Sequence, residues 1–340
     1  MSDIICFGEL MIRLSPPNYL RFEQSDTFEI TFGGAEANVA VDLAFLGKNA
    51  AFVSKFPNNP MGIKARNKLR GYGVNTEHIV FGGERLGIYY QEKGASQRPS
   101  KVVYDRKHSA IAEAQPAEFD WARIFKGARW FHFTGITPSL SGNAASAVRE
   151  ACVKAKEGGL KVSCDLNYRK NLWTTEQAAA TMGPLMKYVD LCIANEEDAE
   201  SVFGISAADT DVKTGKLNQN GYIDVARKLT ETFGFSEVAI TLRESLSAND
   251  NIWGAMLYAG GKSYFSKKYN VHIVDRVGGG DSFAAGLIYS MLEGQAPGDA
   301  VEFAAAASCL KHSVEGDFSH ISAGEVKTLV AGDSSGRVQR

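Results

Sequence analysis

Residues 275–286 read DRVGGGDSFAAG, in which three glycines precede a segment of helical spacing over Asp281–Leu292. Glycines at the start of a helix let backbone N–H groups surround an anion, and the helix dipole favours negative charge there. Asp281 would lie at the mouth of such a site, where its carboxylate could accept the proton of an attacking hydroxyl. Alternatively, Asp281 only caps the helix, as Asp often does. Taken alone, the stretch favours the cap, but three glycines are more than a cap needs, and the next motif shifts the balance toward an anion site beside a general base.

A second glycine pair precedes the first predicted helix, Ala35–Leu46. Residues 33–40 read GGAEANVA. Because Gly33 and Gly34 carry no side chains, the hydroxyls of a ligand could approach the backbone there. Asn38, one turn inside the helix, offers both a donor and an acceptor. A tight turn from a strand into a helix would explain the same glycines, so this motif alone leaves both interpretations open.

Short apolar runs with strand character alternate with longer segments of helical spacing along most of the chain. The predicted strands are Ile4–Phe7, Ala51–Lys55, Trp130–Thr134, Leu160–Cys164, Leu191–Ala194 and Val238–Leu242. The other predicted helices are Pro60–Gly71, Asn143–Lys156, Thr175–Tyr188, Tyr222–Phe233, Gly298–His312 and Ser322–Val330. This alternation predicts an α/β fold with a doubly wound, mostly parallel sheet. We expect a single domain over residues 1–330 and a C-terminal tail over 331–340.

Two segments, 12–32 and 87–106, break this pattern because they resemble short strands without a helix between them. We expect them to be insertions that form a small β-lid over the main sheet. Their strand edges would be exposed unless another chain covered them, so we also expect a homodimer through the lid. Residues 207–219 are polar and contain glycine, which predicts an exposed loop.

The composition argues against several other classes of protein. Of the 340 residues, 37 are Lys or Arg and 39 are Asp or Glu, and no basic block stands out, so we expect no nucleic-acid partner. No apolar run reaches the roughly 18–20 residues of a membrane span, and the N-terminus lacks the pattern of a secretory signal. The five cysteines are scattered without metal-binding spacing. We therefore expect a cytoplasmic protein without a membrane partner.

Together, the two glycine motifs resemble the two signature regions of the ribokinase-like carbohydrate kinases, the phosphofructokinase-B family. The resemblance spans nearly the whole chain, with both motifs in the family's order and at its spacing. It implies an ATP-dependent sugar kinase that uses Mg²⁺. In that family the first glycine pair, here Gly33 and Gly34, contacts the sugar together with Asn38. The second region forms the anion hole, here Gly278, Gly279 and Gly280, with Asp281 as the catalytic base.

The nucleotide side departs from the family pattern in two places. Asn195 and Asp198 resemble an Asn-x-x-Glu element that arranges Mg²⁺ and phosphate through waters, but Asp198 is shorter than the usual Glu. An acidic first helical turn that complements the dipole would look the same. The glycine loop expected after Val238–Leu242 is missing, because residues 243–250 read RESLSAND. We expect the nucleotide to contact Thr241, Arg243 and Ser245 there, and Asn167 where the family approaches the ATP phosphates.

Two arginines indicate which class of sugar the kinase accepts. Arg106 lies in SKVVYDR, residues 100–106, and Arg169 lies in DLNYRKNLW, residues 165–173. The planar guanidinium suits a carboxylate, which a neutral sugar lacks. Both stretches resemble those of kinases for the acidic sugar 2-keto-3-deoxygluconate. That resemblance implies that Tyr90, Tyr104, Arg106 and Arg169 contact the keto acid, and that Asp317 holds its distal hydroxyls. The alternative for each arginine is a surface ion pair.

Tyr89 and Tyr90 alternate sides of one predicted strand, so only one can face a ligand; we assign Tyr90. The expected reaction is phosphorylation of the terminal hydroxyl by ATP, giving 2-keto-3-deoxy-6-phosphogluconate. One alternative is a kinase for a neutral sugar such as fructose, tagatose or ribose, which would not need the two arginines. Another is a sugar-binding regulator that has lost catalysis, which the altered nucleotide loop favours and Asp281 disfavours.

Overall fold

The computed structural model describes residues 2–195, 197–207 and 219–333. Most of the predicted loop 207–219 lies outside these ranges, and the predicted tail 331–340 is described only as far as residue 333. In the described part of the chain, no helix is long and apolar enough to cross a membrane.

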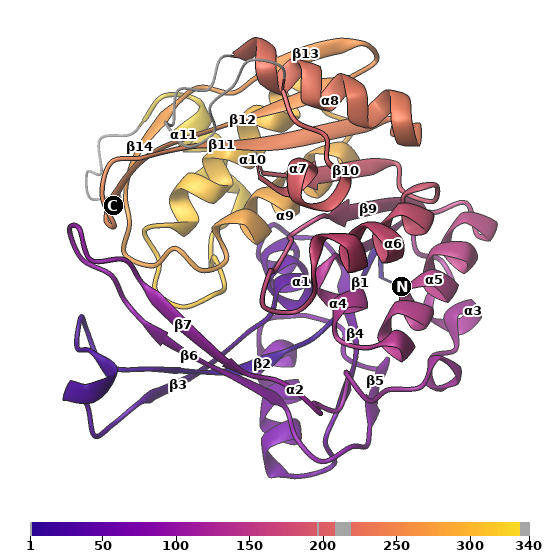
Figure 1. The fold of residues 1–340 in the computed structure, drawn as a ribbon, viewed down its shortest axis with the longest axis vertical. Helices are drawn as coiled ribbons and strands as arrows, with labels where there is room; N and C mark the ends of the chain where they lie inside the picture. Colours follow the sequence, from indigo (N-terminus) through magenta and orange to yellow (C-terminus); the bar gives the residue numbers. More distant parts are fainter. Residues whose placement is uncertain (1, 196, 208–218, 334–340) are drawn as a thin grey trace.

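A large sheet runs through the centre of the molecule (Figure 1). Its parallel strands follow the order β11-β10-β9-β8-β1-β4-β5, and β12, β13 and β14 are added antiparallel beyond β11. The strands are β1 (Ile4–Phe7), β4 (Ala50–Phe56), β5 (Ile79–Phe81), β8 (Trp130–Thr134), β9 (Lys161–Asp165), β10 (Leu191–Ala194), β11 (Glu237–Ser245), β12 (Asp250–Ala259), β13 (Lys262–Phe265) and β14 (Tyr269–His272). The predicted doubly wound α/β fold is confirmed.

Helices cover both faces of this sheet. They are α1 (Ala35–Phe45), α2 (Pro60–Gly71), α3 (Trp121–Ile124), α4 (Ile136–Ser139), α5 (Gly142–Glu157), α6 (Thr175–Met186), α7 (Asp198–Phe203), α8 (Gln219–Phe233), α9 (Gly279–Leu292), α10 (Pro297–Lys311) and α11 (Ala323–Val330). Alternate strand residues serve opposite faces: Ile4 and Cys6 pack in the core beneath α1, α9 and α10, whereas Ile5 and Phe7 pack beneath α5, α6 and α8. Because both faces are covered, the central strands are almost wholly apolar.

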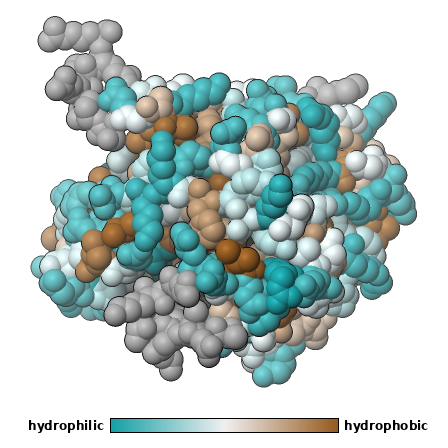
Figure 2. Space-filling view, turned by 90° about the horizontal axis from the view of Figure 1, so that it is seen from above, coloured by the Kyte–Doolittle hydropathy of each residue, from teal (hydrophilic) through white to brown (hydrophobic). Residues whose placement is uncertain are grey.

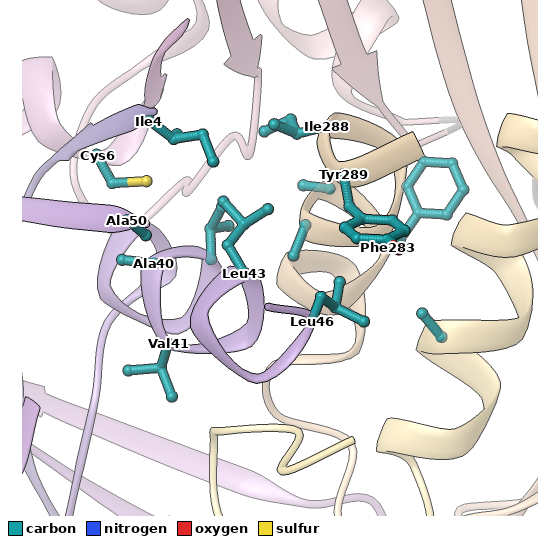
Figure 3. Packing of buried hydrophobic residues seen from close by; sticks show 14 of the residues in the cluster. Ile4, Cys6, Ala40, Val41, Leu43, Leu46, Ala50, Phe283, Ile288 and Tyr289 are labelled. Atoms are coloured by element: carbon teal, nitrogen blue, oxygen red, sulfur yellow. The ribbon is translucent and has the colours of Figure 1, made fainter. Parts of the chain in front are cut away.

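Helices α1 and α9 carry the two glycine motifs at their N-termini, and they pack directly against each other. Leu43 of α1 and its C-cap residue Leu46 face Phe283 and Ile288 of α9 in the buried cluster of Figure 3. Burying a large apolar side chain contributes roughly 1.5–3 kcal/mol. This packing therefore fixes the two motifs relative to each other.

The two predicted insertions form a second, smaller sheet with the order β3-β2-β6-β7. Its strands are β2 (Met11–Ser15), β3 (Glu29–Gly33), β6 (Gly87–Glu92) and β7 (Lys101–Asp105). In Figure 1 this sheet extends away from the helices at the lower left. We call it the lid. Another face of the molecule, seen in Figure 2, shows hydrophobic side chains only as small patches among hydrophilic ones.

Candidate active site

A cavity of about 420 Å³ lies where the carboxyl ends of the parallel strands meet the lid. Ligands of open α/β sheets bind at this edge. Most of the residues expected at the site line this cavity: Gly34, Asn38, Tyr104, Arg106, Asn167, Arg169, Asn195, Asp198, Thr241, Arg243, Gly278, Gly279, Gly280, Asp281 and Asp317. Gly33, Tyr90 and Ser245 are not among the lining residues.

Asp281 occupies the first turn of α9, and its carboxylate is oriented by a partner from α1. Its Oδ2 accepts a hydrogen bond of 2.7 Å from Asn38 Nδ2, while Asn38 Oδ1 accepts one of 3.2 Å from the Gly34 amide. The cap residue of α9 is Gly278, so the expectation that Asp281 might only cap the helix is not supported. Burial raises the pKa of Asp281 to about 6, against the lowering effect of the Asn38 bond.

The glycines are needed for close approach. Gly278 has a φ of +85°, and a Cβ there would lie 2.0 Å from the Asp317 carbonyl oxygen. A Cβ on Gly280 would meet nothing within 4 Å, which leaves its backbone open toward the cavity. Gly33 does not line the cavity, but a Cβ there would lie 1.9 Å from Asp317 Oδ2. Gly33 therefore makes room for Asp317.

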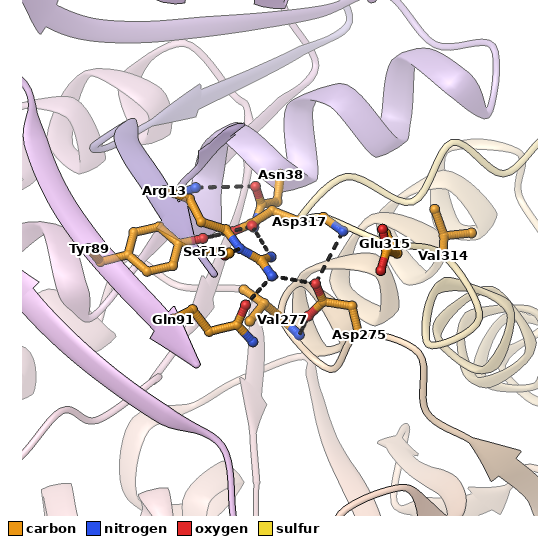
Figure 4. A network of polar contacts seen from close by, with 12 residues as sticks. Arg13, Ser15, Asn38, Tyr89, Gln91, Asp275, Val277, Val314, Glu315 and Asp317 are labelled. Carbon is orange, nitrogen blue, oxygen red and sulfur yellow. Dashed lines mark hydrogen bonds and ion pairs between the residues drawn. The ribbon is translucent and has the colours of Figure 1, made fainter. Parts of the chain in front are cut away.

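Asp317 belongs to a buried polar network that the sequence did not reveal (Figure 4). Arg13 of β2 is 2% exposed and forms ion pairs with Asp275 and, at 2.8 Å, with Asp317. Tyr89 donates to Asp317 Oδ2 at 2.6 Å. The only signal in the sequence was a charged residue between Ile12 and Leu14 in an apolar strand. The network fixes Asp317 at the wall of the cavity.

The assignment of Tyr90 to the cavity is wrong in this structure, because Tyr89 occupies that position. In the lid, Arg13, Tyr89 and Tyr104 are aligned across neighbouring strands on the face toward the cavity. Tyr90 points to the opposite face, where its ring packs against Phe28 with centroids 6.0 Å apart. Alternation along a strand limited the choice to one tyrosine, and only the buried network decides which.

The two arginines differ in their surroundings. Arg106 is 7% exposed, and its Nε and Nη2 both donate to Glu9 Oε2, with the Nε bond at 2.8 Å. Its guanidinium also lies 5.3 Å from the centre of the Tyr104 ring. Arg169 is exposed at the cavity, and its guanidinium forms no hydrogen bond or ion pair with a described residue. The alternative of an ion pair thus applies to Arg106, although the pair is buried.

Acidic and amide side chains follow β9 and β10 on the other side of the cavity. Asp198 Oδ1 accepts from the Tyr168 amide at 3.1 Å, and Asn195 Oδ1 accepts from the Asp198 amide at 3.0 Å. Burial raises the pKa of Asp198 to about 6. Asp165, which the sequence interpretation missed, lines the cavity beside them, and burial followed by the charges of Asp198 and Asp281 raises its pKa. Within the described ranges, no group of three or more His, Cys, Asp or Glu residues could hold a metal.

A hairpin takes the place of the missing glycine loop. Strand β11 continues to Ser245 and pairs with β12, so Ser245 is exposed and does not line the cavity. Thr241 and Arg243 do line it, as does Arg276, whose Nη2 donates to the Ala248 carbonyl at 2.9 Å. Burial and the neighbouring Arg243 lower the pKa of Arg276. This wall presents two guanidinium groups near the anion hole, of which the sequence interpretation assigned only one.

Comparison with known proteins agrees with this geometry. Residues 1–321 match the pfkB family of carbohydrate kinases. A 2-dehydro-3-deoxygalactonokinase of Haloferax volcanii is 33% identical over 335 residues, which cover 98% of each chain. The crystal structure of a 2-dehydro-3-deoxygluconokinase from Thermotoga maritima is 52% identical, with a TM-score of 0.94 over 98% of this chain and 100% of that chain. A fructokinase of Xylella fastidiosa with bound ATP shares the fold, with a TM-score of 0.77 at 21% identity over 97% of this chain and 99% of that chain.

Proposed function

Because the chain belongs to the pfkB family of carbohydrate kinases, we propose that it phosphorylates 2-keto-3-deoxygluconate, also called 2-dehydro-3-deoxygluconate. The products would be ADP and 2-keto-3-deoxy-6-phosphogluconate. The observation that carries this proposal is Arg169, a guanidinium in the same cavity as Asp281 that pairs with no residue the structure describes. An anionic sugar gives that guanidinium a charged partner, whereas a neutral sugar offers only uncharged acceptors. The names of the Thermotoga and Haloferax relatives point to the same class of sugar acid.

The chemistry follows from the two ends of the cavity. Asp281, oriented by Asn38, would accept the proton of the terminal hydroxyl as that oxygen attacks the γ-phosphorus of ATP. The amides of Gly278–Gly280 and the N-terminus of α9 would stabilise the charge on the transferring phosphoryl group. Tyr89, Tyr104 and Asp317 would hold the sugar acid from the lid side.

The opposite end of the cavity suits ATP and Mg²⁺. Thr241, Arg243 and Arg276 line the cavity, and so do Asn167 and Asn195. Oxygen ligands such as the carboxylates of Asp165 and Asp198 are those that Mg²⁺ prefers, and this ion usually keeps several waters. These residues would hold the ion through water, and the ion would neutralise phosphate charge. The Asp198 carboxylate accepts hydrogen bonds from the Tyr168 and Asn195 amides, which fix its orientation and support this role.

The first test is a substrate panel with purified protein, ATP and Mg²⁺, read by release of ADP. We expect kcat/KM for 2-keto-3-deoxygluconate or its galactonate epimer to exceed that for fructose, tagatose and ribose by about 10- to 150-fold, the effect of one charge-assisted hydrogen bond. A neutral sugar as the best substrate would replace the proposed one. If no sugar of the panel causes release of ADP, the sugar-binding regulator would be favoured. The hydrogen bond from Asn38 that orients the Asp281 carboxylate argues against such a loss of activity.

We also propose that two chains form a homodimer through the outer face of the lid. On this face Ile30, Leu14, Tyr90 and Val103 are aligned across the four strands. Ile30 is 50% exposed and Val103 is 53% exposed, which leaves an apolar surface on the side away from the cavity. A second copy of the same face is a self-complementary partner, because the commonest oligomers are dimers with two-fold symmetry. The cytoplasmic location expected from the sequence stays a prediction.

Val103→Asp should convert this dimer to a monomer, because it would bury a charge in the apolar face, on the edge strand β7. Light scattering during gel filtration should give half the wild-type mass. The control is Ile63→Asp, since Ile63 is also exposed, at 41%, but lies on α2 outside the lid. A monomeric wild-type protein, or a dimer that Val103→Asp leaves intact, would rule out the lid interface.

A further inference from the structure

The turn of the lid hairpin contacts the hairpin that replaces the missing glycine loop. The lid turn, residues 95–98, lies between β6 and β7, and the other turn, residues 246–249, joins β11 to β12. The Ala248 amide donates to the Ser96 carbonyl at 2.7 Å, and the Ser96 amide donates to Asn249 Oδ1, also at 2.7 Å. We call this contact of Ser96 with Ala248 and Asn249 the lid contact.

The lid contact is closely fitted although both turns lie at the surface. Ser96 is exposed and has a φ of +53°, a conformation that residues other than glycine rarely adopt and that persists only where the surroundings hold it. Both of its backbone polar groups bond to one hairpin, although water could satisfy them. The crevice between the two hairpins has a volume of only about 10 Å³, room for about one water molecule.

The two residues on the β11–β12 side of the lid contact also hold the proposed nucleotide end of the cavity. The Ala248 carbonyl accepts from Arg276 Nη2 at 2.9 Å, and the Asn249 carbonyl accepts from the Ile273 amide at 2.6 Å. Arg276 lines the cavity, and Ile273 precedes it in the segment that leads to the glycines of the anion hole. Two adjacent residues therefore bond to the lid with one set of groups and to the nucleotide end with another.

The lid hairpin in turn carries residues of the proposed sugar end. Tyr89 on β6 and Tyr104 on β7 both line the cavity. Strands β6 and β7 are paired from Ile88 to Glu92, so the hairpin connects these tyrosines to the lid turn through a continuous ladder. A sugar acid that fixes the two tyrosines would therefore also fix the lid turn, and through the lid contact the carbonyl that holds Arg276.

We propose that Asn249 is a positioning residue that couples the two ends of the cavity, so that the sugar acid and ATP each strengthen the binding of the other. Its side chain fixes the lid turn on the β11–β12 hairpin, and the neighbouring Ala248 carbonyl fixes the Arg276 guanidinium toward the ATP phosphates. Coupling between two binding sites is reciprocal, so each ligand raises the affinity for the other by the same factor. The inference rests on the proposed sugar kinase and adds a residue outside its cavity.

The coupling is measured by calorimetry with the non-hydrolysable analogue AMP-PNP and Mg²⁺, with and without the sugar that the wild-type protein phosphorylates. In the wild-type protein the sugar should lower the Kd of AMP-PNP at least about fivefold, the lower end of ordinary coupling. Asn249→Ala removes the acceptor of the Ser96 amide and should reduce this factor by roughly 2- to 10-fold, the effect of one neutral hydrogen bond. The Kd of each ligand alone should stay nearly unchanged, because Asn249 does not line the cavity.

Three further variants show whether the lid contact carries the effect. Asn249→Asp keeps an acceptor for the Ser96 amide and should keep the coupling. Leu246→Ala is the matched control, because Leu246 lies in the same turn, is 67% exposed and has no polar atom in its side chain; its coupling should equal that of the wild-type protein. Arg276→Ala should weaken AMP-PNP binding itself, and adding Asn249→Ala to it should cost no further coupling. Wild-type coupling in Asn249→Ala, or an equal loss in Leu246→Ala, would overturn the proposal.

Hydrogen exchange separates this inference from the proposed function, because it needs only the nucleotide. AMP-PNP with Mg²⁺ should slow amide exchange in residues 94–100 of the wild-type protein, and it should slow exchange there less in Asn249→Ala. No slowing in the wild-type protein would refute the coupling even if the keto acid is phosphorylated. Slowing in the wild-type protein without turnover of any sugar would defeat the proposed function and leave the connection between nucleotide and lid standing.

Discussion

Asp281→Asn is expected to lower kcat by roughly 10²–10⁴-fold, the usual contribution of a general base. The amide oxygen of the new residue can still accept the hydrogen bond from Asn38, so the geometry at the start of α9 should persist. Thermal unfolding and ATP affinity should therefore stay close to those of the wild-type protein. A variant that keeps more than about a third of the wild-type kcat would show that Asp281 is not the base.

The pH dependence of kcat/KM shows whether Asp281→Asn removes the catalytic base or only disturbs the geometry of the site. Burial raises the pKa of Asp281 to about 6, and a base must be ionised to accept a proton. In the wild-type protein kcat/KM should therefore fall as the pH drops below about 6, by about tenfold per pH unit. The residual activity of Asp281→Asn should lack this decrease. A decrease of the same shape in the variant would assign it to another group, such as Asp198, whose pKa is also raised to about 6.

The parts of the fold that could be predicted are those where one local pattern decides the structure. Ile4–Phe7, Trp130–Thr134 and Leu191–Ala194 were predicted with the bounds that the structure shows, because each is a short apolar run buried on both faces. The antiparallel strands β12, β13 and β14 were missed. Strands β13 and β14 lie at the edge of the sheet and contain polar residues, so no apolar run marks them. Strand β12 lies inside the sheet and does contain an apolar run, over residues 252–259, which the sequence interpretation overlooked.

The candidate site also has parts that a local sequence pattern predicts and parts that it does not. The glycine motifs could be placed because close backbone approach leaves a mark in the sequence itself. The pairing of Arg106 with Glu9 and of Arg13 with Asp317 could not, because the partners lie 97 and 304 residues apart. The choice between Tyr89 and Tyr90 failed for this reason, since it depended on the hydrogen bond to Asp317. The sequence thus indicated which residue types gather at the site, but not which of them neutralise one another.

This pairing also changes which arginine gives the cleaner test of the substrate. Arg106→Ala would leave Glu9 buried at 2% exposure without its cation, so lost activity could reflect a disturbed lid. Arg169 is exposed at the cavity and has no such partner within residues 2–195, 197–207 and 219–333. Its loss should leave no unpaired carboxylate behind. Arg169 is therefore the residue on which the assignment to an acidic sugar should be tested.

Arg169→Ala should lower kcat/KM for the keto acid by roughly 10- to 150-fold, because a hydrogen bond to a charged group contributes roughly 1.5–3 kcal/mol. Most of the loss should appear in KM if the carboxylate is bound equally in the ground and transition states. Arg169→Lys should recover only part of it, since the ammonium cannot form the bidentate pair. Lys170→Ala is the matched control, because Lys170 is the next residue, also exposed, and does not line the cavity.

Two effects of Arg169 must be kept apart from its contact with the sugar. Its charge lowers the pKa of Asp281, so Arg169→Ala should raise that pKa further. The assays therefore belong about two pH units above the wild-type value of about 6, where Asp281 is ionised in both proteins. ATP affinity needs a separate measurement, since Asn167 is only two residues away. At that pH, weak activity on fructose should change little, because fructose has no carboxylate to lose. Equal losses on fructose and the keto acid, with ATP affinity unchanged, would remove the carboxylate contact and leave the neutral-sugar kinase as the better assignment.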